Sequence, residues 1–204
     1  MNSYCICNFF VILEFYKQCK WYFMLDYNNN FKDLITKYPD LWKNKQFKVG
    51  KTLLEAGEFA NKNFYIESGI IRSYYQSEKK DKEIIIGFFS EDDSITFHRS
   101  FIEPIMLYLD FEVIEDASVW VINDEDWNKI EAQEPKLHEL MHKEHDKVIR
   151  RLVEYSIIRN ESDALERYNI FVRSRPYASR LKIEHIAMYI GVLPSTLSAL
   201  RSKT

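Results

Sequence analysis

The chain has 204 residues, of which 46% are hydrophobic and 29% are charged, as expected for one large globular domain or two small ones. Gly and Pro contribute five residues each, which excludes collagen-like and linker-dominated chains, and no apolar run reaches the ~20 residues that a membrane span requires. The net charge of −3 is unevenly placed, because Arg150–Thr204 carries ten basic and five acidic residues and the preceding part is acidic. A basic C-terminal end indicates a polyanionic partner.

The first thirty residues are expected to be an extension that precedes the folded part. This segment holds the three cysteines of the chain, Cys5, Cys7 and Cys19. An odd number of cysteines does not close a disulfide framework and fits a reducing cytoplasm, and three thiolates are one short of a usual iron–sulfur site. The apolar run 5–16 lacks the flanks of a secretory signal. One hypothesis is that translation begins at Met24, so that residues 1–23 are not native.

Short strands follow a short helix. The helix is expected over 31–38, since Phe31, Leu34 and Ile35 share one face and Pro39 ends it. A turn at Gly69 and another at Glu115–Asp116 are expected to separate strands. The predicted strands cover 47–54, 64–66, 70–76, 83–89, 107–114 and 118–122. Their spacing of roughly ten residues is typical of a sandwich or barrel.

Helices are predicted after Ile122. Asn123 or Asp124 can cap a helix that runs to Ile130, and a long helix is expected over Lys136–Arg159. The apolar residues of the long helix lie within about 60° of each other, and they are Leu137, Met141, Val148, Leu152 and Tyr155. So narrow a stripe is either a pairing seam between two copies of the chain or a surface that packs on the chain's own strands.

Three histidines share one face of the long helix. His138, His142 and His145 follow the spacing i, i+4 and i+7. Neutral imidazoles at this spacing can bind Zn²⁺, with Glu139 or Asp146 nearby. The alternative is a solvated helix edge, and no metal is assigned here. The carboxylates of the strand region lack the His or Ser partners that catalysis needs, so an enzyme is not expected.

The last two helices carry the functional signal. A helix is predicted over 162–174, and two short ones over 182–189 and 194–202, joined by Gly191–Leu193. A small Ala187 allows a close crossing, and Gly191 can adopt the positive φ that ends a helix. This is the helix-turn-helix pattern, in which the second helix enters the major groove. The candidate DNA contacts are Ser195, Thr196, Ser198, Arg201 and Lys203; Arg173, Arg175, Arg180 and Lys182 could add phosphate contacts.

Blocks of residues in the same order resemble the Crp/Fnr superfamily of bacterial transcription regulators, and most nearly its short, wing-less members typical of Bacteroidetes. The resemblance covers about residues 31–204. Its blocks are 63–75, Lys82–Glu83 before 84–89, Ser100–Phe101, 163–168 and the helix-turn-helix segment 186–198. It implies an α+β fold with a cyclic-nucleotide-binding-type β jelly-roll barrel (31–135), a dimer helix (136–160) and a helix-turn-helix domain (161–204).

Some positions depart from the family pattern. Leu193 stands where relatives often have a capping Thr, at a cost of about 1 kcal/mol. Ala199 stands where relatives often have an Arg that can contact guanine, and Lys182–Ile183 replaces the usual Pro–Gln. The stretch 90–110 lacks the Gly–Glu of cyclic-nucleotide binders and has one arginine, Arg99. We therefore do not expect cAMP as the effector.

The sequence thus predicts a cytoplasmic, homodimeric regulator that binds double-stranded DNA, with no cofactor and no membrane association. The alternative is a sensor barrel that binds a small molecule and whose DNA affinity is weakened or lost, as the residues at 193 and 199 suggest. The identity of an effector, the operator sequence and the direction of regulation stay open.

Overall fold

A computed structural model describes residues 30–77, 79, 82–96 and 107–202. Residues 31–204 belong to one compact unit, and the account below concerns its described part. The cysteine-containing segment, the possible start at Met24, Arg99, Ser100–Phe101 and Lys203 lie outside the described residues, so the expectations about them stay predictions.

All the described strands form one antiparallel sheet. They are β1 (Lys43–Phe47), β2 (Thr52–Leu54), β3 (Lys62–Ser77), β4 (Lys82–Phe89), β5 (Ser94–Ile95) and β6 (Asp110–Asn123). Neighbouring strands follow the order β1-β6-β3-β4, with β2 paired to β6 and β5 paired to β3. The long strands β3 and β6 therefore form the centre of the sheet, and the shorter strands are attached to them.

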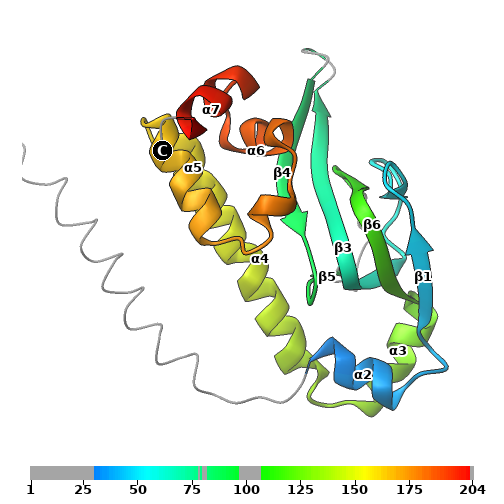
Figure 1. The fold of residues 1–204 in the computed structure, drawn as a ribbon. Coiled ribbons are helices and arrows are strands. Elements are labelled where there is room, and N and C mark those ends of the chain that lie inside the picture. The colour runs from blue at the N-terminus through cyan, green and yellow to red at the C-terminus, as the bar shows by residue number, and fades with distance from the viewer. Residues whose placement is uncertain (1–29, 78, 80–81, 97–106, 203–204) are drawn as a thin grey trace, which may run out of the picture. The chain divides into compact units, whose positions relative to one another are not determined.

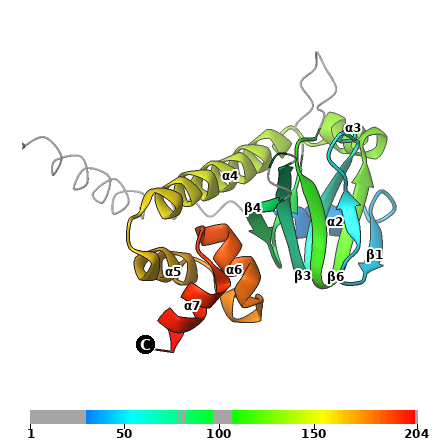
Figure 2. The same cartoon turned by 90° about the horizontal axis from the view of Figure 1, so that it is seen from above.

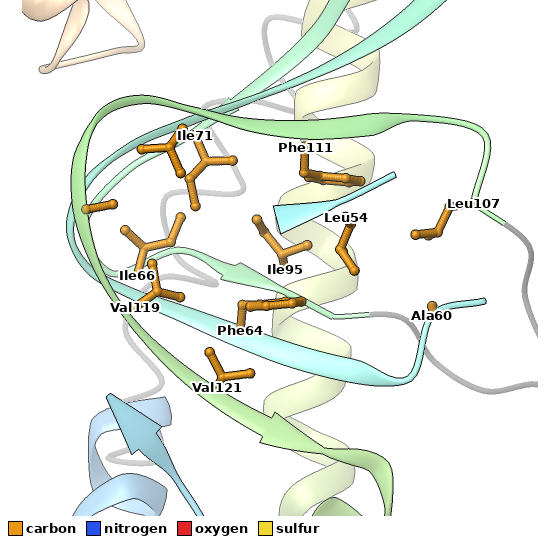
Figure 3. Close-up of a cluster of buried hydrophobic side chains, with 12 residues drawn as sticks. Leu54, Ala60, Phe64, Ile66, Ile71, Ile95, Leu107, Phe111, Val119 and Val121 are labelled. Carbon is orange, nitrogen blue, oxygen red and sulfur yellow. The ribbon is translucent and has the colours of Figure 1, made fainter. Parts of the chain in front are cut away.

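The sheet curls around an apolar cluster (Figure 3). Alternate residues of β3 and β6 point into it, as the two-residue period of a strand requires. Phe64, Ile66, Val119 and Val121 are examples, each at most 7% exposed. The cluster also includes Leu54, Ala60, Ile71, Ile95, Leu107, Phe111, Val113 and Ala117. Every member is a hydrocarbon side chain, so the sheet encloses a packed core of its own.

The turn expected at Gly69 is wrong, since β3 runs through this residue. Gly69 has φ +95°, and the pairing of β3 with β6 shifts between Ile66 and Ser68 and again between Ser68 and Ile70. The two strands expected on either side of Glu115–Asp116 are likewise one strand, β6. A bulge lets a long strand bend without ending, so the sequence signals of a turn mark a bend here.

Seven helices lie in the described part of the chain. They are α2 (Phe31–Lys37), α3 (Asp124–Gln133), α4 (Leu137–Asn160), α5 (Ala164–Arg173), the short 3₁₀ helix η1 (Ala178–Arg180), α6 (Ile183–Ile190) and α7 (Pro194–Arg201). The expected cap of α3 is confirmed at Asn123, whose side chain accepts a hydrogen bond from the Asp126 N–H at 2.8 Å. Asp163 caps α5 in the same way, through the Glu166 N–H.

The helices meet the sheet through two further apolar clusters. One joins α2, α3 and the start of α4 through Phe31, Trp127 and Leu140. The other, here called the C-terminal core, joins α5, α6 and α7 to β3 and β4. Figures 1 and 2 show these two groups of helices at opposite ends of α4. The C-terminal helices thus share their apolar core with the sheet.

No single helix in the described part of the chain is long and apolar enough to cross a membrane. The bent pair of α6 and α7, counted together, has the length and composition of such a segment, and this is the extent of that likeness.

Candidate nucleic-acid interface

The helices α6 and α7 form a sharply bent pair. Three residues separate them, and their axes differ by 108°. Gly191 ends α6 in the left-handed conformation, with φ +75°, as expected from the sequence. The N–H groups of Gly191 and Val192 both donate to the Ala187 carbonyl, at 2.9 and 3.0 Å. The turn is therefore built from backbone hydrogen bonds that a glycine at 191 permits.

Buried side chains fix the angle between the two helices. Ile186, Ala187 and Ile190 on α6 and Leu197 on α7 are at most 2% exposed. Ala187, the small residue expected to allow a close crossing, is fully buried. These residues belong to the C-terminal core, which also holds Phe88 of β4. The pair is thus held as one rigid body against the sheet.

Tyr189 connects α6 to three aromatic rings. Its ring centroid lies 5.5 Å from Phe88, 5.2 Å from Phe171 and 5.0 Å from Tyr155. Such tilted ring pairs contribute about 0.5–1.5 kcal/mol beyond their buried area. Its hydroxyl accepts a hydrogen bond from Arg175 at 2.8 Å. A strand, α4 and α5 therefore all contribute to the position of α6.

Arg167 ties the turn to the end of α4, a role that the sequence analysis missed. Its Nε donates to the Glu161 carbonyl at 2.6 Å, and its Nη1 donates to the Ile190 carbonyl at 3.2 Å. The last carbonyls of a helix lack partners within the helix and are satisfied by such donors. Arg167 stands in the block 163–168 that carries the family resemblance. The need for a donor near the end of α6 was the signal that could have identified it.

The exposed face of α7 carries the sequence-predicted residues. Ser195, Thr196, Ser198 and Arg201 are all exposed, and so is Ala199. The guanidinium of Arg201 lies 5.9 Å from the ring of Tyr168 on α5. Four of the five predicted contact residues are therefore exposed on α7, and the fifth, Lys203, falls outside the described residues. We call the exposed residues of Leu193–Arg201, that is all except Leu197 and Leu200, the α7 surface.

Two of the flanking basic residues do not face solvent freely, contrary to expectation. Arg175 is 7% exposed and pairs with Glu154 of α4. Arg180 donates to Glu91 at 2.7 Å and to Glu115 at 2.5 Å. These carboxylates occupy the donors that phosphate groups would need. Arg173 is 69% exposed at its side chain and Lys182 is exposed, so these two stay available.

His185 lies where α6 packs on the sheet. Its Nδ1 is buried without a hydrogen-bond partner among the described residues. Burial lowers the pKa of His185 below its ordinary value, and the charges of Arg72 and Lys182 lower it further, whereas Glu112 and Glu184 oppose them. Burial therefore favours the neutral imidazole, the form that allows α6 to pack on the sheet without an added charge.

The long helix α4 has two different halves. Leu137 and Met141 at its start are buried against α2 and α3, so this half packs on its own chain. The second half exposes Val148, Ile149, Leu152, Val153 and Ile157, each 41–57% exposed. Leu137 and Met141 of the predicted stripe thus follow the second alternative and pack on the chain itself, and Tyr155 packs on the C-terminal core. Val148 and Leu152 lie among the exposed apolar residues.

The three histidines of α4 do not form a metal centre in the described structure. His138 and His142 are exposed, and His145 is half-buried. No group of three or more His, Cys, Asp or Glu side chains in the described ranges is arranged to hold a metal ion. Glu144, on the same helix, is buried instead and accepts a hydrogen bond from Ser94 at 2.6 Å. This contact anchors α4 on β5.

Three solved structures share the fold. FixK2 from Bradyrhizobium japonicum is 18% identical, with a TM-score of 0.69 over 79% of this chain and 83% of FixK2. The c-di-GMP-responsive global regulator CLP of Xanthomonas campestris is 14% identical, with a TM-score of 0.66 over 84% and 90%. A transcriptional regulator of the CRP family from Thermus thermophilus is 17% identical, with a TM-score of 0.58 over 78% and 83%.

No family model matches the chain, and a search of curated proteins also finds no match. The likeness to the solved structures confirms the predicted resemblance at the level of the fold. The fold is a mixed one, in which an antiparallel sheet is followed by a helical C-terminal part, as in structures of Crp/Fnr regulators.

Proposed function

We propose that the chain is a homodimeric, DNA-binding transcriptional regulator of Crp/Fnr type that acts in the cytoplasm. The observation that carries this proposal is the α6–α7 pair, whose helices differ in direction by 108° and whose second helix exposes Ser195, Thr196, Ser198 and Arg201. A bend of this size and a short glycine-containing turn are typical of helix-turn-helix motifs. In such motifs the second helix enters the major groove.

Each part of the DNA interface has a separate role in this proposal. Hydroxyl groups of Ser195, Thr196 and Ser198 meet base edges or phosphates, and Arg201 and Lys203 meet phosphates. We keep the domain boundaries expected from the sequence: an extension (1–30), a jelly-roll barrel (31–135), a dimer helix (136–160) and a helix-turn-helix domain (161–204). The likeness of the fold to that of Crp/Fnr regulators supports this division.

Dimerisation follows from the second half of α4. Five large apolar side chains stay exposed there, and exposed apolar patches of this kind mark interaction surfaces. A second copy of the same helix offers a matching surface around a two-fold axis. Two such copies place two α7 helices so that they reach half-sites one helical turn apart.

The barrel is proposed as the sensor part, with an unidentified effector that is not cAMP. Its described interior is lined by hydrocarbon side chains (Figure 3). Burying a cyclic phosphate there without charged donors would cost several kcal/mol. Any anion site would therefore depend on residues outside this apolar cluster.

Replacing Thr196 and Arg201 together by Ala is expected to weaken DNA binding about ten-fold. The double variant removes one hydroxyl contact and one phosphate contact, and it should also lower the slope of log affinity against log salt by about one. The measurement is an anisotropy titration of the full-length protein with a duplex selected from random DNA, at several salt concentrations.

The matched control is Thr36→Ala with Lys45→Ala, which likewise removes one hydroxyl group and one positive charge, from exposed positions on α2 and β1. It should bind as the unaltered protein does. The proposal would be overturned if the unaltered protein bound no duplex at low ionic strength, and that result would favour the sensor alternative.

Leu152→Glu is expected to convert the protein into a monomer. The change places two carboxylates opposite each other in the proposed helix pair, and burying such charges costs several kcal/mol. Sedimentation velocity measures the outcome. Val49→Glu, which alters another exposed apolar side chain, 54% exposed and far from α4 in the sequence, should leave the mass unchanged. A dimer that survives Leu152→Glu places the interface elsewhere.

A further inference from the structure

Leu193 occupies a position where its side chain contributes little to the fold. The residue is the N-cap of α7, and no side-chain hydrogen bond caps this helix. Leucine is among the least favourable residues at an N-cap, since it has no acceptor for the free N–H groups. The side chain is also 69% exposed, so it adds little to the C-terminal core. Neither capping nor packing explains a leucine here.

The neighbours of Leu193 on the α7 surface are small and uncharged. Ser195, Thr196, Ser198 and Ala199 are exposed, and none of them carries an amide or a guanidinium group. Leu193 is the N-cap and Thr196 is the third residue of α7, the position over which the side chain of an N-cap residue lies. The N-terminal half of the α7 surface therefore presents methyl groups and hydroxyls.

Three nearby arginines have other partners and do not supply a guanidinium group to the start of α7. Arg167 donates to the backbone carbonyls of Glu161 and Ile190, while Arg175 and Arg180 are paired with carboxylates. Arg201 stands at the last position of α7, whereas the first residues of a recognition helix are the ones that contact base edges. No residue at the start of α7 itself, Leu193 to Thr196, therefore carries the forked guanidinium group that binds guanine.

We propose that Leu193 and the Thr196 methyl group contact thymine C5-methyl groups, so that the preferred DNA has thymine rather than guanine opposite the start of α7. This inference rests on the proposed function and adds the base preference of the same surface. The thymine methyl is the apolar feature of the major groove. One buried methyl contributes about 0.8 kcal/mol, which corresponds to about a four-fold change in affinity.

The test uses duplexes in which single thymines are replaced by uracil. Uracil lacks the methyl group and keeps the same hydrogen-bonding atoms. The full-length protein first selects a preferred duplex from a random pool, and each thymine of one half-site is then replaced in turn. At one or two positions we expect the affinity of the unaltered protein to fall about four-fold for each methyl lost.

The variant Leu193→Ser separates base contact from folding. Serine caps a helix well, so the variant should melt at a higher temperature and yet lose the sensitivity to uracil at one position. Val172→Ala, which trims an exposed apolar side chain on α5, should keep that sensitivity. Equal uracil effects in the unaltered protein and in Leu193→Ser, or no uracil effect at all, would overturn the inference. Failure to bind any duplex would instead overturn the proposed function.

Discussion

Replacing Gly69 by Ala is expected to destabilise the protein by more than about 4 kcal/mol, a loss at the extreme end for single substitutions. A Cβ at this position would lie 2.5 Å from the Asp116 carbonyl oxygen and 2.6 Å from the Ala117 Cα. These are backbone atoms of β6, so no flexible side chain can move aside to relieve the overlap. The left-handed φ of +95° adds strain for any residue with a Cβ.

Gly57→Ala is the matched control, because it introduces the backbone strain of a positive φ without the steric overlap with β6. Gly57 has a similar φ of +89°, but an added Cβ would meet nothing within 4 Å. Gly57→Ala should lower the free energy of unfolding by about 1 kcal/mol, from the strain of the backbone conformation alone. Urea unfolding followed by circular dichroism measures both free energies of unfolding. Similar losses in the two variants would show that β6 adjusts to a side chain at position 69 and that the bulge is not tightly packed.

Replacing Arg175 by Met is expected to lower the free energy of unfolding by about 3 kcal/mol. The guanidinium is 7% exposed and binds Glu154 and the Tyr189 hydroxyl. Its carbon Cζ lies 4.5 Å from the centre of the Phe171 ring. Methionine retains the apolar contacts but leaves Glu154 charged and without its cation. Removing one partner of a buried pair costs about 3–5 kcal/mol, and the low end applies because Glu154 is 23% exposed.

A second substitution, Glu154→Gln, should restore part of the loss in the Arg175→Met background, because it removes the unpaired charge. Arg173→Met is the control, since its side chain is 69% exposed and its pair with Glu166 is long at 3.3 Å. Arg173→Met should change the free energy of unfolding by at most about 0.5 kcal/mol. Equilibrium unfolding in guanidinium chloride compares the variants. If Arg175→Met proved as mild as Arg173→Met, the pair with Glu154 would not hold the C-terminal helices.

The ends of several helices could be predicted from single residues, because the chemistry of the residue at the end determines where the helix starts or stops. Gly191 ends a helix because only glycine adopts a positive φ without strain, and Asn123 begins one because its side chain accepts a backbone N–H. With Leu197 on the buried side of α7, the 3.6-residue period of a helix predicts which positions are exposed. The helix pair and most of its exposed residues could thus be predicted from a single sequence.

Contacts between distant segments could not be predicted in this way. In the sequence, a glycine that ends a strand at a turn cannot be distinguished from a glycine in a bulge. At Gly69 the pairing of β3 with the partner strand near Asp116 decides for the bulge. The charge of Arg180 gives no hint that Glu91, 89 residues earlier, will bind it. The apolar residues of α4 form one pattern in the sequence, although those of the first half are covered by the chain itself and five of the second half are exposed.

The C-terminal core has a consequence for how this chain can diverge. Ile70, Ile85 and Phe88 lie on strands yet cover the same cluster as Ile186 and Leu197. The last forty residues therefore do not form an independent folding unit. Separating them from the sheet would expose apolar side chains on the strands and on the helices. Substitutions on the outer side of α7 leave this shared cluster intact, whereas substitutions at its buried residues disturb the strands and the helices together.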